Sequence, residues 1–148
     1  MAPGEFIAQI RRDVEEHDTR VLVIDSLNGF LNAMPGERDL VLHLHELVAF
    51  LNQSGVLTLL ILTQHGLVGS THSDLDVSYL SDTVVLLRYF EMKGKIRQVI
   101  SVLKQRTGRH ERTLRELTMS GDGLTISGPL SSLRGVLTGV PGLATNND

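Results

Sequence analysis

The sequence predicts an α/β fold in which a mostly parallel sheet is followed by antiparallel hairpins. Two largely apolar runs, 21–24 and 56–63, each follow a segment with helical periodicity, as is typical of parallel strands buried on both faces. Beyond residue 88 the pattern changes to short strands joined by Gly-containing turns, which indicates hairpins. We expect one domain over residues 1–141 and a disordered tail over 142–148.

The first half of the chain is expected to alternate helices and strands. Apolar residues at helical spacing predict a first helix from Pro3 to about His17, followed by a strand that ends at Asp25. A short mixed segment, 27–33, stops at a Met-Pro-Gly break. A second helix begins near Glu37 and ends before Gly55, and the second strand follows it at 56–63. The apolar stripe of this second helix comprises Leu40, Val41, Leu44, Leu47, Val48 and Leu51.

The second half begins with a predicted mobile loop over 64–76 that is rich in Gly, Ser, Thr, His and Asp. One helical turn at 77–81 and a third apolar strand at 83–87, which we expect to join the parallel sheet, come next. Two hairpins are then predicted, over 88–104 and 112–127, and the second turns at an Asp-Gly pair. The end of the chain, 139–148, is small and polar and is expected to fray.

Composition restricts the function classes. A net charge of −3 gives no electrostatic footprint for nucleic acid, and the 64–76 loop has no Lys or Arg. No apolar run is long enough to span a membrane, so we expect neither nucleic acid nor membrane as partner. The absence of cysteine excludes disulfides and thiolate metal sites and suits the cytoplasm. No His pair has the helical spacing of a zinc site.

The strongest candidate residue is Asp25. Four apolar residues end in this carboxylate, so a buried parallel strand would present it at the carboxyl edge of the sheet, where α/β folds bind ligands. There an Asp would hold Mg²⁺ or its water beside nucleotide phosphates. The alternative is an Asp that caps the next turn. No Gly-x-x-x-x-Gly-Lys-Ser/Thr loop precedes Asp25, so the phosphate half of such a site is not found in this sequence.

Two further features follow buried strands. Gln64, at the end of the second strand, would sense the γ-phosphate or the attacking water, or be an ordinary loop residue. The cluster over 104–110 contains Lys104, Arg106 and His110. It is either a solvated strand end or a group of cations directed at phosphate on this chain or on a neighbouring subunit.

Together these segments resemble the KaiC-type RecA-like ATPases over nearly the whole chain. Residues 20–29 look like the Walker B segment of that family, and four later stretches occur in the family's order. These are 79–91 (YLSDTVVLLRYFE), 100–106 (ISVLKQR), 110–116 (HERTLRE) and 135–141 (GVLTGVP).

The resemblance implies roles for particular residues. Asp25 would be the Walker B carboxylate, and Gln64 would occupy the position of the γ-phosphate sensor. Lys104 and Arg106 would match a Lys-x-Arg pair that reaches ATP bound to the adjacent subunit of a ring, with His110 beside the same nucleotide. Clock proteins of the family autophosphorylate a Ser-Thr pair at the positions of Ser78 and Tyr79, and the Tyr departs from that pattern.

The resemblance also implies that the P-loop and the catalytic glutamates precede the matched region. We therefore expect the carboxyl-terminal part of a KaiC-like ATPase domain, inactive alone, whose intact form uses ATP and Mg²⁺ but which binds neither tightly by itself. The alternative is a non-catalytic module that docks on a complete subunit. In the intact sheet the P-loop strand lies between 56–63 and 83–88, so we expect these strands to pair directly or with another copy, because open apolar edges invite association.

Overall fold

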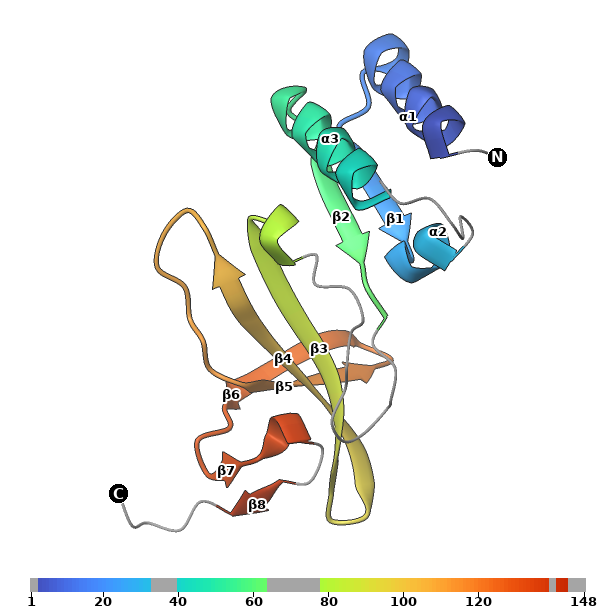
Figure 1. The fold of residues 1–148 in the computed structure, drawn as a ribbon. Coiled ribbons are helices and arrows are strands. Elements are labelled where there is room, and N and C mark those ends of the chain that lie inside the picture. Colours follow the sequence, from blue (N-terminus) through green and yellow to red (C-terminus); the bar gives the residue numbers. More distant parts are fainter. Residues whose placement is uncertain (1–2, 33–39, 64–77, 139–140, 144–148) are drawn as a thin grey trace. The chain divides into compact units, whose positions relative to one another are not determined.

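The computed structural model describes residues 3–32, 40–63, 78–138 and 141–143, and the chain divides into two compact units, Met1–Thr63 and Gln64–Asp148 (Figure 1). Each unit has its own core of buried apolar side chains. None of the described helices is long and apolar enough to cross a membrane.

The described part of the first unit, residues 3–32 and 40–63, contains three helices and a two-stranded parallel sheet. Its elements are α1 (Pro3–His17), β1 (Val21–Asp25), α2 (Leu27–Asn32), α3 (Leu40–Gln53) and β2 (Leu57–Ile61). β1 pairs with β2 in a register that places Val21 beside Leu57 and Asp25 beside Ile61. The predicted α-β-α-β order is therefore confirmed, although the predicted start of the second helix near Glu37 lies outside the described residues.

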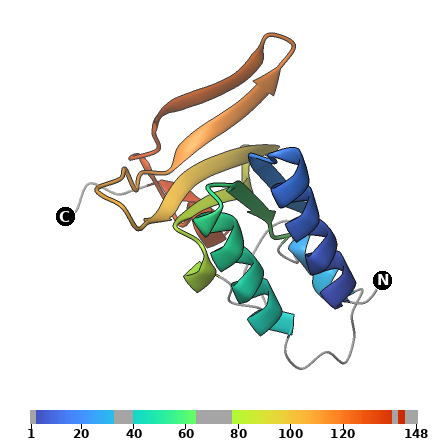
Figure 2. The same cartoon turned by 90° about the horizontal axis from the view of Figure 1, so that it is seen from above.

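The core of this unit lies where α1 and α3 pack together (Figure 2). Ile10, Leu47, Leu51 and Val56 form its buried centre. The spacing of Leu40, Leu44, Leu47 and Leu51 places all four on the buried side of α3, as the helical pattern predicts. Gly55 follows α3 with a φ of +70°, a conformation in which glycine readily ends a helix.

The second unit is a four-stranded antiparallel sheet in the order β3-β4-β5-β6, with smaller elements around it. Its elements are η1 (Ser78–Leu80), β3 (Thr83–Met92), β4 (Lys95–Gln105), β5 (Arg115–Ser120), β6 (Gly123–Pro129), β7 (Leu133–Arg134), η2 (Val136–Thr138) and β8 (Gly142–Leu143). Phe90, Val99 and Val136 form its buried core.

Both predicted hairpins are present, but the expected boundary between the third strand and the first hairpin is wrong. Residues 83–87 and 88–90 belong to one strand, β3, because nothing in that stretch interrupts the extended backbone. The chain turns only at Lys93 and Gly94, whose φ values of 52° and 69° are those a tight hairpin turn requires.

In the second unit β3 pairs antiparallel with β4 along one edge. Within the first unit β1 and β2 pair in parallel. Pairing of the 56–63 and 83–88 edges, directly or with another copy, stays a prediction. Two residues of the expected tail, Gly142 and Leu143, pair with β7, and residues 144–148 lie outside the described part.

Candidate functional site

The carboxyl edge of the parallel sheet presents Asp25 to solvent. This Asp is the last residue of β1, beside Ile61 in the register, and it is exposed. The peptide bond that follows it, Asp25–Ser26, is cis. Ser26 then caps α2, since its Oγ accepts a hydrogen bond from the backbone N–H of Gly29 at 3.3 Å. The strand end and the cap together place the Asp25 carboxylate at the position that the sequence predicts.

A side chain that sequence reasoning missed joins the ends of the two parallel strands. The backbone N–H of Thr63 donates to Oδ1 of Asn28 at 2.8 Å, across 35 positions of sequence. Asn28 therefore ties the segment after β2 to the first turn of α2, close to Asp25 in the chain. The sequence feature that could have indicated this role is an Asn three residues after the Asp that ends the first strand. Gln64 is the next residue after Thr63, but it and the 64–76 loop lie outside the described residues.

The chemistry of Asp25 suits a weakly held hard cation. Over the described ranges no cluster of three or more His, Cys, Asp or Glu side chains forms a protein-only metal cage. Mg²⁺ does not need such a cage, because it often binds through one or two carboxylates, substrate phosphates and water. A single exposed carboxylate fits that mode and predicts little metal affinity without nucleotide.

In the second unit, Lys104 lies near the end of β4 and Arg106 is the first residue after the strand. Lys104 lies opposite Val84 in the β3–β4 register, next to an irregularity in the pairing, and it is half-buried. The backbone N–H of Arg106 donates to the carbonyl of Asp82 at 2.8 Å and continues the connection to β3. Gly108, with a φ of +135°, then turns the chain away from the strand.

The Arg106 guanidinium already has partners from its own unit. It forms a 3.1 Å ion pair with the carboxylate of Asp82 and donates to the carbonyl of Tyr79 at 3.2 Å. Both charged side chains are more than half exposed, at 56% and 53%. Exposed pairs of this kind contribute about 0.2–1 kcal/mol, so a phosphate group would replace the carboxylate at little cost.

His110 is half-buried, and its Nε2 atom is buried without a hydrogen-bond partner. A buried polar atom left unpaired costs about 1–3 kcal/mol, which a ligand or a water molecule would recover. His110 is therefore not a fully exposed surface residue, and the nucleotide contact that the family resemblance implies for it stays a prediction.

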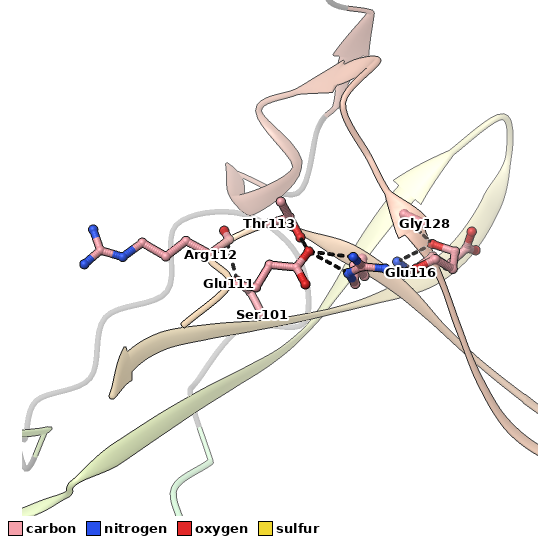
Figure 3. A network of polar contacts seen from close by, with 8 residues as sticks. Ser101, Glu111, Arg112, Thr113, Glu116 and Gly128 are labelled. Atoms are coloured by element: carbon pink, nitrogen blue, oxygen red, sulfur yellow. Dashed lines mark hydrogen bonds and ion pairs between the residues drawn. The ribbon is translucent and has the colours of Figure 1, made fainter. Parts of the chain in front are cut away.

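A polar network holds the segment that follows His110 (Figure 3). The Glu111 carboxylate accepts hydrogen bonds from the Thr113 hydroxyl and from the guanidinium of Arg115, the latter at 2.6 Å. Arg115 also donates to the carbonyl of Ser127 at 2.9 Å, and Ser101 on β4 donates to the carbonyl of Arg112 at 3.4 Å. These contacts attach the 111–115 segment to β4 and β6 and so fix the direction in which the chain leaves His110.

The same network perturbs one titratable group. The pKa of Glu111 lies below its ordinary value, chiefly because the Thr113 hydroxyl donates to the carboxylate and secondarily because Arg115 donates to it and adds positive charge. Hydrogen bonds and a cation both favour the ionised form. Glu111 is therefore a structural anion that orients Arg115.

The candidate residues fall into two groups. Asp25 belongs to the first unit, together with the newly found Asn28, whereas the cations and His110 lie near one end of β4 in the second unit. Lys104 and Arg106 are two positions apart at the end of β4, and the predicted Gln64 lies outside the described residues.

Comparison with known proteins identifies relatives of the chain. The model of a family described as the KaiC ATPase matches residues 1–131. The circadian clock protein KaiC3 of Synechocystis sp. is 29% identical over 131 residues, which cover 86% of this chain and 25% of that protein. The circadian clock oscillator protein KaiC of Prochlorococcus marinus subsp. pastoris is 30% identical over 139 residues, covering 89% and 26%. Its counterpart in Parasynechococcus marenigrum is 25% identical over 143 residues, covering 94% and 27%. The chain thus spans about a quarter of the length of the curated relatives it matches.

Proposed function

Because the chain belongs to the KaiC ATPase family, with its RecA-like α/β fold, we propose that it supplies the metal-facing and trans-acting elements of a KaiC-type ATP site. Asp25 holds Mg²⁺, Gln64 senses the γ-phosphate, and Lys104, Arg106 and His110 contact nucleotide bound to a neighbouring subunit. ATP and Mg²⁺ are the ligands of the intact domain. By itself the chain binds neither tightly and does not hydrolyse ATP.

The observation that carries this proposal is the position of Asp25. The carboxylate is exposed at the carboxyl edge of a parallel sheet, and the Asn28–Thr63 hydrogen bond keeps the ends of β1 and β2 joined there. Ligands of open α/β sheets bind at this edge. Bound Mg²⁺ would neutralise charge on the β- and γ-phosphates, and the Asp25 carboxylate would orient the ion or its water.

The cations act on a neighbouring subunit, either another copy of this chain or a complete KaiC-like subunit. Arg106 is suited to this role because its ion pair with Asp82 is exposed and weak, so its guanidinium is able to exchange a carboxylate for a phosphate. His110 contributes a buried ring nitrogen that has no partner in its own unit.

Isothermal titration calorimetry of the chain with ATP in the presence of Mg²⁺ tests the proposal. We expect a dissociation constant weaker than about 10 µM, which corresponds to about −7 kcal/mol. Tighter binding would contradict the view that the P-loop of the intact domain makes most of the contacts to the phosphates. Asp25→Asn should abolish the Mg²⁺ dependence of whatever ATP contact remains. Asp122→Asn, which alters an exposed Asp in the β5–β6 turn, is the matched control.

A second candidate is a non-catalytic module that docks on a complete ATPase subunit and presents Arg106 to its nucleotide. The half-exposed guanidinium of Arg106 favours this possibility, because it is accessible to a nucleotide on another protein. A docking module also does not require Asp25 to bind metal. Mixing the chain with the complete Synechocystis relative and measuring ATP hydrolysis tests it. Stimulation that Arg106→Ala removes would support the module. Arg20→Ala is the control, because Arg20 also forms an exposed ion pair, with Asp18, at 2.8 Å.

A further inference from the structure

Arg106 is bound to the segment that leads into β3 through its backbone and, separately, through its side chain. Its backbone N–H donates to the Asp82 carbonyl at 2.8 Å. Its guanidinium pairs with the Asp82 carboxylate at 3.1 Å and donates to the Tyr79 carbonyl at 3.2 Å. The backbone hydrogen bond involves neither charged group. The carboxylate and the guanidinium can therefore separate by side-chain rotation while the backbone of both residues stays in place.

The Arg106–Asp82 pair is much more exposed than another ion pair of the same unit. Arg97 pairs with Glu116, and these side chains are only 34% and 18% exposed. The Arg97 guanidinium also lies over the ring of the buried Phe90. Burial and the ring hold Arg97 in its ion pair, whereas water reaches both members of the Arg106–Asp82 pair, so an anion from solution can compete for Arg106.

The Asp82 carboxylate determines which anions compete successfully. Because it is attached to the same chain beside Arg106, its effective concentration is on the order of millimolar. A free carboxylate or a chloride ion carries one charge and gains nothing electrostatically over Asp82. A terminal phosphate group carries about −1.5 to −2 charges at pH 7 and has three acceptor oxygens, which can bind two guanidinium nitrogens in parallel. The pair therefore favours terminal phosphates over singly charged anions.

We propose that Asp82 is a specificity-determining residue, whose carboxylate occupies the Arg106 guanidinium until a terminal phosphate group displaces it. The inference rests on the proposed function in one respect, namely that Arg106 contacts a phosphate. It adds that a residue of the same chain lowers the affinity of Arg106 for phosphate and in return excludes weaker anions. Specificity is commonly obtained in this way, by a competing or repulsive group that reduces affinity for every ligand but most for the wrong ones.

The Nε–Hε NMR signal of Arg106 in the isotope-labelled full chain tests the proposal, and Arg106→Lys assigns the signal by removing it. The probes are inorganic tripolyphosphate and acetate, compared at equal ionic strength. In the native protein we expect the signal to shift saturably with tripolyphosphate and to stay unchanged with acetate. Asp82→Asn should bind tripolyphosphate about 1.4- to 5-fold more tightly, the range that follows from the strength of exposed ion pairs, and should also respond to acetate.

Two further variants separate the role of Asp82 from a change in net charge. Asp18→Asn removes one negative charge from the exposed ion pair with Arg20, and Asn tolerates the φ of 53° at that position. We expect it to leave both titrations of the Arg106 signal unchanged. Asp82→Glu keeps the charge and should keep the preference for tripolyphosphate over acetate. The backbone amide spectrum of each variant establishes that it is folded.

The possible outcomes distinguish this inference from the proposed function. If tripolyphosphate binds equally well to the native protein and to Asp82→Asn, the inference is overturned, whereas the phosphate contact of Arg106 stands. If the Arg106 signal responds to tripolyphosphate in neither protein, both are overturned. A gain in affinity that Asp18→Asn reproduces is an effect of net charge and also overturns the inference.

Discussion

The hydrogen bond from the Thr63 N–H to Asn28 offers a direct test of how the carboxyl edge of the parallel sheet is held. Asn28→Ala removes the acceptor and leaves the Thr63 amide without its 2.8 Å partner. The bond lies at an exposed position, so water will partly replace it and the loss should be about 0.5–1.5 kcal/mol. If local opening governs exchange, that loss corresponds to a roughly 2- to 13-fold faster exchange of the Thr63 amide hydrogen.

Native-state hydrogen exchange, read amide by amide by NMR, measures this effect. Asn28→Asp keeps an acceptor at the same place and should preserve most of the protection. The amide of Leu47, in the buried part of α3, should exchange at an unchanged rate in both variants, which would show that the change is local. If Thr63 exchanges equally fast in the native protein and in Asn28→Ala, Asn28 does not join the two strand ends, and the argument for a preformed edge beside Asp25 fails.

Three further outcomes are expected. Phe90→Ala should lower the free energy of unfolding of the second unit by about 3–5 kcal/mol in urea titrations, because Phe90 is fully buried; a loss below about 1 kcal/mol would contradict the assigned core. Glu111→Gln should flatten the acid limb of the stability profile. The lowered pKa of Glu111 means that its contribution is present above the ordinary glutamate pKa and is lost as pH falls through the folded-state value, so an unchanged acid limb would refute the assignment. Asp82→Asn should cost less than about 1 kcal/mol of stability, since the pair with Arg106 is exposed, and a larger loss would show that the pair is not easily exchanged for phosphate.

Most of the local structure could be read from the sequence. The stripe ending at Leu51 predicts α3, the apolar run before Asp25 predicts β1, and the Lys-Gly and Asp-Gly pairs mark the two hairpin turns. These signals are local, because side-chain periodicity and backbone preferences act within a few residues. The position of Asp25 at the sheet edge follows from the same reasoning.

The polar contacts of the candidate site could not be derived in this way. Asn28 binds Thr63 across 35 positions of sequence, and Arg106 reaches back across 27 positions to the carbonyl of Tyr79. Nothing in the composition of either segment specifies such a partner. The unpaired ring nitrogen of His110 likewise depends on what surrounds it, so only coordinates reveal it.

The amino-acid order alone determined the helices, the strands, their turns and the kinship with KaiC ATPases, because each depends on neighbouring residues or on matched stretches in a fixed order. The tertiary structure alone decided that β3 forms one long strand, Thr83–Met92, that pairs with β4 in an antiparallel sheet. It also decided which side of β3 Val136 covers and which side stays open to water. The physical reason is that a strand with apolar residues on both faces is compatible with several neighbours, and the choice between them is made by packing between segments far apart in the chain.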